Sequence, residues 1–302
     1  FLGEHLVPFH FLPSWESGLA EGKFLSPEAA RLLAIRFPGT DESPVALHYP
    51  NAFFTGACLR AGELPLWNPH QGCGLPALGC GNSYPFSPFL APFYFHPTPW
   101  VYSFGLLTGS LFSAMGAWLW LRKFGWRPWV TAFAAGLWAF NPETIRIIVF
   151  SSVWAAWWFG WLLWAWDGFL LDPLRRSWRP ALAVTGMVYC GHPEVALFLA
   201  GASLLYATAT WALSAPARPP LGRFAAGVLG VVLLAGALTA VHWMAVAGHL
   251  PESASYKQVG GGAAAALHYD WGDFLDPKTE IFVSPLLLGL GLAGLAAACG
   301  HK

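Results

Sequence analysis

Residues 102–121 read YSFGLLTGSLFSAMGAWLWL, an apolar run without a charge that ends at Arg122. A helix needs about 20 apolar residues to cross the hydrocarbon core of a bilayer, so this run predicts a transmembrane helix. Long apolar runs recur at 147–171, 194–213, 224–250 and 281–299, and shorter ones at 129–140 and 181–190. The chain is therefore predicted to be an all-α integral membrane protein.

The composition supports this class and excludes others. Of the 302 residues, 56% are apolar or aromatic and 11% are charged, and the mean hydropathy is +0.48. An ordinary soluble domain has about 25% charged residues. Lys plus Arg is 16 and Asp plus Glu is 16, so no basic field exists to hold a phosphate backbone. We expect membrane lipids as partners and no nucleic acid, and we exclude a soluble enzyme and a disordered chain.

Three short loops carry half of the 16 Lys and Arg residues. They contain Arg122, Lys123 and Arg127; Arg175, Arg176 and Arg179; and Arg218 and Arg223. Short basic loops stay in the cytoplasm. Two cytoplasmic loops must be joined by an even number of crossings, so 129–140 pairs with 147–171 and 181–190 pairs with 194–213. Each short stretch is then a thin, tilted or partly re-entrant crossing, which gives about seven spans.

This topology divides the chain into two parts. Residues 1–101 form an extracytoplasmic loop segment with interfacial helices, and residues 102–302 form the transmembrane domain, with its main outer loop at 251–280. Of the 16 acidic residues, only Asp167 and Asp172 fall on the cytoplasmic side. The acidic residues are therefore expected mostly on the outer side. A protein that served only as a membrane anchor would not need this asymmetry. Because the segment 1–101 must be translocated, we expect a further helix before Phe1.

Two hairpins also resemble each other in sequence. Trp126-Arg127-Pro128 returns as Trp178-Arg179-Pro180, and Asn141-Pro142-Glu143 returns as His192-Pro193-Glu194. We interpret this as an internal helical-hairpin repeat, with chance recurrence of common dipeptides as the alternative. The Pro-Glu turn suits the start of a helix, where proline fits and a carboxylate favours the positive end.

A set of motifs resembles a known family. The set comprises Asp41, His48-Tyr49-Pro50, Gly62-x-x-Pro65-Leu66-Trp67-Asn68-Pro69, Gly72-x-Gly74-x-Pro76 and Tyr84-Pro85. Together they are similar to the first outer loop of YfhO-type bacterial membrane proteins. Gly191-His192-Pro193-Glu194 and the run from Pro285 to Leu288 also resemble segments of that family. The likeness covers nearly the whole chain, which would form the N-terminal part of such a protein.

The resemblance implies a function. The family belongs to the GT-C superfamily, whose members transfer a sugar from a polyprenyl-phosphate carrier to an extracytoplasmic acceptor. It implies a location in the bacterial cytoplasmic (inner) membrane and an acidic catalytic base in the first outer loop. Asp41 is the candidate, with Glu42 and Glu4 as alternatives, because Asp41 lies farther from Tyr49 than in the family pattern.

Other candidates follow from the chemistry. Arg146, His192 and Glu194 would meet the donor phosphate and sugar. The acceptor or loop site would contain Trp67, Asn68, His70, His268 and Asp270. A tryptophan stripe would line a lipid slot, and it consists of Trp154, Trp157, Trp158, Trp161, Trp164 and Trp166. Each group has a plainer interpretation as turn, helix cap, interfacial anchor or packing residue.

Cofactors and other functions stay open. No metal site is assigned, because the sequence has no H-x-x-x-H or C-x-x-C spacing, although a divalent cation near Asp270 is an alternative. A second hypothesis is a non-catalytic subunit packed against other membrane subunits in a larger complex. A third is a lipid or sugar flippase or transporter, which an internal repeat and broken helices would suit.

Overall fold

The computed structural model describes residues 48–70, 74–79, 84, 86–146, 148, 151–214 and 218–249. Within these ranges the regular structure is helical, apart from one backbone bridge between Asn68 and Leu75. The all-α prediction is confirmed for this part of the chain. The chain divides into two compact units, 1–249 and 250–302, and all described residues belong to the first. The predicted outer loop 251–280 and span 281–299 lie outside the described residues.

Three helices are long and apolar enough to cross a membrane, among the residues described. They are α5 (Pro99–Leu121), α12 (Pro193–Leu213) and α13 (Leu221–Leu238). The predicted spans 102–121 and 194–213 agree with α5 and α12. Proline occupies the first position of both helices, where its missing N–H costs nothing. The Thr98 side chain caps α5 by accepting a hydrogen bond from the Val101 N–H at 3.4 Å.

The two short apolar stretches also form helices. α6 covers Pro128–Ala139 and α11 covers Trp178–Cys190. At about 1.5 Å per residue, each is about 20 Å long, which is less than the hydrocarbon core of a bilayer. These lengths agree with the prediction of short elements and leave the count of seven crossings as a prediction.

Two predicted spans are interrupted. In place of one helix over 147–171, the structure has α8 (Ser151–Ala156) and α9 (Phe159–Leu171), with a turn at Trp157 and Trp158. The Trp158 N–H donates to the Ala155 carbonyl three residues back, so the turn is tightened. The predicted span 224–250 is α13 followed by α14 (Ala240–His249).

The second interruption lies at Thr239. Its hydroxyl donates to the Ala235 carbonyl at 2.7 Å. A threonine hydroxyl that bonds back to the carbonyl four residues earlier often bends a helix, and this bond accompanies the break between α13 and α14.

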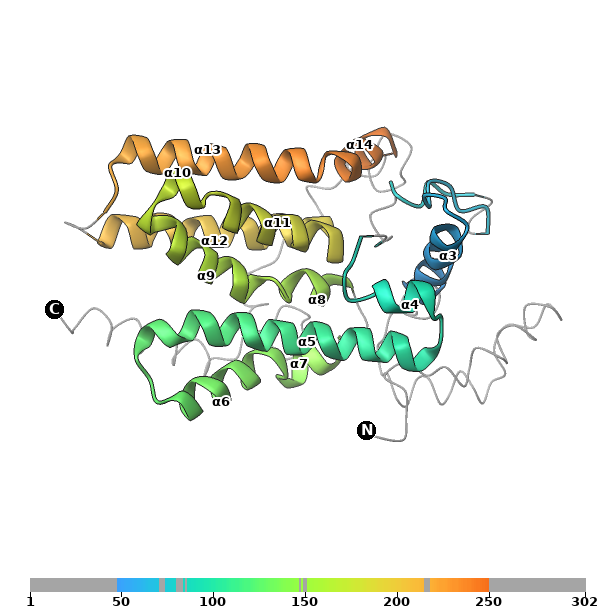
Figure 1. Cartoon of the computed structure of the whole chain (residues 1–302), viewed down its shortest axis with the longest axis horizontal. Coiled ribbons are helices and arrows are strands. Elements are labelled where there is room, and N and C mark those ends of the chain that lie inside the picture. Colours follow the sequence, from blue (N-terminus) through green and yellow to red (C-terminus); the bar gives the residue numbers. More distant parts are fainter. Residues whose placement is uncertain are drawn as a thin grey trace, which may run out of the picture. The chain divides into compact units, whose positions relative to one another are not determined.

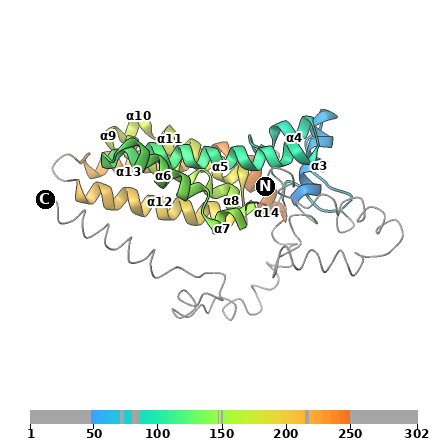
Figure 2. The same cartoon turned by 90° about the horizontal axis from the view of Figure 1, so that it is seen from below.

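The helices pack in a chain of neighbours (Figures 1 and 2). α5 packs against α6 and α9, and α9 packs against α11 and α12. α11 and the short α10 (Pro173–Arg176) pack against α13. The connections from α5 to α6, α9 to α11 and α12 to α13 lie at one end of the bundle, which we call the basic end. α3 (Tyr49–Arg60) and α4 (Ala91–Phe95) lie at the opposite, distal end.

A polar network joins three helices at the basic end. Lys123 Nζ lies 3.0 Å from Asp167 Oδ2, and the Tyr206 hydroxyl donates to Asp167 Oδ1 at 2.5 Å. Lys123 also donates to the Tyr206 hydroxyl. The network therefore links the end of α5 to α9 and α12.

Large apolar side chains cover the outside of the bundle. Exposed examples on the long helices and α6 are Phe104 and Leu111 of α5, Trp129 and Phe133 of α6, Phe198 and Leu205 of α12, and Leu229 and Leu233 of α13. Phe198 is 79% exposed. A soluble monomer rarely exposes such contiguous apolar surface, whereas a bilayer solvates it. The surface of these helices thus has the character expected of a membrane protein.

Candidate functional site

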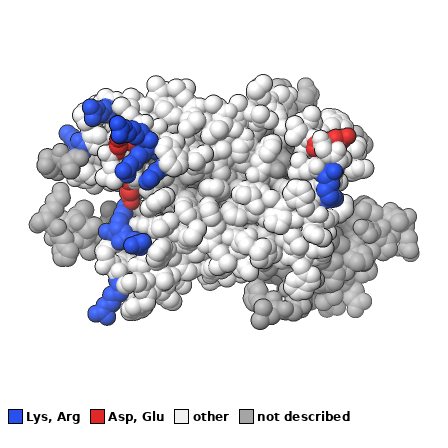
Figure 3. All heavy atoms as spheres, viewed as in Figure 1, with Lys and Arg blue, Asp and Glu red and all other residues white. Residues whose placement is uncertain are grey.

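Charged residues occupy the two ends of the bundle unequally (Figure 3). The eight cations of the three basic loops gather at the basic end, with Asp167 and Asp172 beside them. The prediction that the three basic loops share one end of the helices is confirmed. The side of the membrane on which this end lies stays a prediction.

At the distal end, His48 is buried beneath the segment that follows α3. Its side chain is 4% exposed, and Nδ1 lies 3.3 Å from the Tyr84 hydroxyl. The imidazole lies against Trp154 of α8, with ring centroids 5.9 Å apart. Tyr84 also meets Trp154 edge to face at 4.9 Å. Two motifs of the first loop, His48-Tyr49-Pro50 and Tyr84-Pro85, are thereby held on α8.

The predicted acceptor residues of the first loop separate into buried and exposed members. Asn68 is buried, donates to Asn51 Oδ1 at 3.4 Å, and accepts from the His70 N–H at 3.0 Å. Trp67 and His70 are exposed, and the His70 ring lies against Phe54. Asn68 is therefore the member that organises the loop, while Trp67 and His70 present their side chains outward.

The Gly191–Glu194 corner lies against the start of α8. The His192 N–H donates to the Ser151 carbonyl at 3.3 Å. His192 Nδ1 and Glu194 Oε2 are 3.9 Å apart, and Glu194 is 79% exposed. His192 is the N-cap residue of α12, as its plainer interpretation predicts, but its side chain makes no capping hydrogen bond. Its half-exposed ring is available to a ligand.

Helix α8 brings these two distant segments together. Trp154 carries the contact to His48 and Tyr84, and Ser151 carries the contact to His192. His48 and His192 are far apart in sequence, yet each contacts α8, His48 through its ring and His192 through its backbone N–H. The distal end thus combines the first-loop motifs with the Gly-His-Pro-Glu turn.

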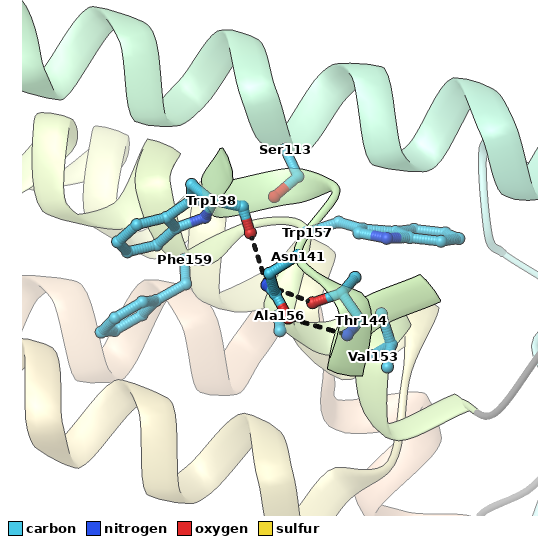
Figure 4. A pocket seen from close by; sticks show the side chains of 8 residues that line it. All are labelled: Ser113, Trp138, Asn141, Thr144, Val153, Ala156, Trp157 and Phe159. Atoms are coloured by element: carbon cyan, nitrogen blue, oxygen red, sulfur yellow. Dashed lines mark hydrogen bonds between the residues drawn. The ribbon is translucent and has the colours of Figure 1, made fainter. Parts of the chain in front are cut away.

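A cavity of about 430 Å³ lies beside the Asn141 turn (Figure 4). Its wall is formed by Ser113, Trp138, Asn141, Thr144, Val153, Ala156, Trp157 and Phe159. Asn141 Nδ2 donates to the Trp138 carbonyl and to Thr144 Oγ1, and Asn141 Oδ1 accepts from the Thr144 N–H. Most of the wall is apolar, with a polar edge at Ser113, Asn141 and Thr144.

The Asn141 turn follows the short helix α6, which ends at Ala139. Ser113 shares its cavity and lies eight residues before the end of α5, about 12 Å along the helix from the basic end at about 1.5 Å per residue. The side of the membrane on which this turn lies stays a prediction. The chain then continues through α7 (Pro142–Arg146) to Ile148, whose carbonyl accepts from Trp154 Nε1.

The predicted tryptophan stripe is mostly a packing surface. Trp158 donates to Cys190 Sγ, Trp161 to the Phe112 carbonyl and Trp166 to Ser203 Oγ. The Trp154 ring packs against the rings of His48 and Tyr84. Only Trp157 of this stripe lines the cavity, where Trp138 and Phe159, which the sequence did not single out, complete the aromatic wall.

Several predicted site residues lie outside the described residues. They are Asp41, Glu42, His268 and Asp270; for Arg146 the backbone is described as the last residue of α7, and the side chain is not. Among the described residues, no group of three His, Cys, Asp or Glu side chains is placed to hold a metal ion. The structure therefore brings His48, Asn68, His192 and Glu194 to the distal end and leaves the predicted base untested.

The sequence predictions did not include Asn51 or Ser151, which contact Asn68 and, through the Ser151 carbonyl, His192. Tyr84 belonged to a predicted motif without an assigned role, and its hydroxyl lies beside His48 Nδ1. Tyr94 donates from its hydroxyl to the Tyr84 carbonyl, and burial raises the pKa of Tyr94 well above its usual range. Its phenol thus stays neutral. The only sequence signal for these residues was their position among prolines and aromatics, which does not distinguish inward from outward side chains.

No protein-family model matches the chain, and neither a curated protein nor a solved structure is significantly similar to it. No similar protein therefore indicates a function, and the residues and geometry described above are the basis for proposing one.

Proposed function

We propose that this chain is an integral membrane glycosyltransferase of GT-C type, which transfers a sugar from a polyprenyl-phosphate carrier to an acceptor at the distal end. One observation carries the proposal. The two segments that resemble the YfhO-type family, around His48 and around His192, meet on α8 at the end opposite the basic loops. Motifs that serve one reaction must lie close together, and these two segments do so at α8. The basic end would face the cytoplasm of a bacterial inner membrane.

The proposed reaction assigns a role to each group. The carboxylate of Asp41 removes the proton from the acceptor hydroxyl while the oxygen attacks the anomeric carbon. The bond from that carbon to the phosphate oxygen breaks, and polyprenyl phosphate leaves with the electron pair. Arg146 and His192 stabilise the charge that develops on this phosphate. Asn68 and its loop hold the acceptor.

The cavity beside Asn141 suits part of the carrier. Its aromatic wall of Trp138, Trp157 and Phe159 is apolar, and it lies between α5 and the turn after α6. An isoprenoid segment gains free energy when it leaves water for such a wall. The polar edge at Asn141 and Thr144 would mark the limit of the apolar chain.

The experiment is a transfer assay in proteoliposomes. The full chain is reconstituted with a polyprenyl-phosphate sugar labelled in the lipid, and release of polyprenyl phosphate is followed with candidate acceptors present. D41N removes the base and H192Q removes a donor to the phosphate. We expect D41N to lower the rate by at least about 100-fold and H192Q by about 10- to 100-fold.

The matched control is H96Q. His96 is an exposed imidazole that follows α4, and its replacement should leave the rate unchanged. Transfer by D41N at the unaltered rate would remove Asp41 from the mechanism. Equal losses in H96Q and H192Q would remove the special role of the Gly191–Glu194 corner.

A second candidate function is a lipid or sugar flippase. The half-length α6 and α11 and the interruptions at Trp157 and Thr239 are features of transporters, which build sites from discontinuous helices. The same proteoliposomes distinguish the two. A flippase moves the labelled lipid between leaflets without releasing polyprenyl phosphate, and a non-catalytic subunit does neither.

A further inference from the structure

Two arginine side chains converge on one glycine at the basic end. Arg176 Nη1 donates to the Gly168 carbonyl at 3.4 Å. Arg179 Nη1 lies 2.9 Å from the position that a Cβ atom on Gly168 would occupy. Guanidinium groups from α10 and α11 therefore lie against the same point of α9.

Arg179 is held in place by two tryptophans. Its guanidinium carbon lies 5.5 Å from the ring centroids of both Trp164 and Trp178. An indole face attracts a cation without neutralising its charge, and it leaves the N–H groups at the guanidinium edge free to donate. The contact orients the group and keeps its charge.

Within the described residues, no carboxylate pairs with Arg176 or Arg179. Asp167 is engaged by Lys123 and Tyr206, and Asp172 lies 3.8 Å from Arg175. Two like charges beside the same residue repel each other, and an anion bound by both would relieve the repulsion.

Exposed apolar side chains accompany this pair along the chain. They are Leu171, Leu174, Trp178 and Leu182. A ligand that fits both features has an anionic head and apolar chains. We propose that Arg176 and Arg179 form a binding site for the phosphate of an anionic phospholipid in the leaflet beside the basic end. The planar donor forks of arginine match phosphate oxygens, and basic clusters at helix ends recognise lipid headgroups.

Native mass spectrometry of the full chain in detergent tests this site. The protein is titrated with phosphatidylglycerol and, separately, with phosphatidylcholine. We expect phosphatidylglycerol to bind more tightly, and the double variant R176Q/R179Q to weaken its binding by about tenfold or more while phosphatidylcholine binding is unchanged. The matched control R122Q/R127Q removes the same charge from the neighbouring loop and should keep most of the affinity.

Three results would overturn the proposal. Equal losses in the two double variants would indicate diffuse attraction to the surface, and no loss in R176Q/R179Q would exclude the site. Displacement of phosphatidylglycerol by millimolar inorganic phosphate would indicate a site for a small anion.

The variant R176K/R179K keeps the charge and serves if the glutamine variant does not fold. It should also weaken binding, because lysine lacks the planar fork and the stack on indole; unchanged affinity would contradict the geometry. The measurement counts bound lipid and is independent of sugar transfer.

Discussion

Gly191 is the residue at which the distal end has no space for a side chain. A Cβ atom there would stand 2.6 Å from Ala155 Cβ and 2.7 Å from the Ser151 carbonyl oxygen. Its φ of −142° is ordinary extended backbone, so close packing and not conformation requires glycine. The contact holds His192 on α8.

We therefore expect G191A to destabilise the fold by about 1–3 kcal/mol, because the added methyl must push α8 away from the corner. Thermal unfolding in detergent measures the change. G201A is the control, since a Cβ atom on Gly201 would meet nothing within 4 Å. Equal midpoints for G191A and the unaltered protein would show that the corner is loosely packed.

Cys58 of α3 reports on the distal end through its chemistry. Burial and then the charge of Glu63 raise the pKa of its thiol above the ordinary 9.0. Thiolate is the reactive species, so the rate of maleimide labelling in a variant with only this cysteine should keep rising with pH beyond 9. A rate that levels off below pH 9 would contradict the described surroundings of Cys58.

At the level of single residues, the sequence indicates which segments are rich in candidate site residues, but not which of their side chains are buried. Asn68 and Trp67 are neighbours in one motif, yet Asn68 is buried and Trp67 is 58% exposed. The loop that contains them has irregular backbone, so no periodicity separates inward from outward side chains. The tryptophans of the stripe on α8 and α9 are likewise one residue type, yet some pack between helices and Trp157 lines the cavity.

At the level of helices, continuous apolar runs predict the existence of elements and fail at their interruptions. α5 and α12 agree with their predicted spans because each begins at a proline and runs unbroken. The breaks at Trp157 and Thr239 leave no mark in the hydropathy, because both runs stay mostly apolar through the break.

The network of Lys123, Asp167 and Tyr206 should matter for how α5, α9 and α12 stay together. D167N removes the charge that Lys123 and Tyr206 share, so we expect a loss of about 1–3 kcal/mol in the free energy of unfolding. R175Q breaks the exposed pair with Asp172 and should cost about 0–1 kcal/mol. Similar unfolding midpoints for both variants would show that the network contributes no more than a surface ion pair.

At the scale of the whole chain, the account depends on the two ends of the bundle facing opposite sides of a membrane. The described helices expose apolar side chains, the basic loops share one end, and the family-like segments share the other. Composition and the positive-inside rule predicted the separation of charge, and the structure places the loops accordingly (Figure 3). From this separation of charge we predict that the helices cross a bilayer with the basic end in the cytoplasm.

Cysteine labelling in right-side-out spheroplasts tests this claim most directly. Each variant carries one cysteine, either Cys58, E194C at the distal corner, or S214C at the exposed end of α12. A membrane-impermeant maleimide should label Cys58 and E194C in intact spheroplasts and S214C only after lysis. Labelling of S214C from the same side as Cys58, or of Cys58 and E194C from different sides, would contradict the account.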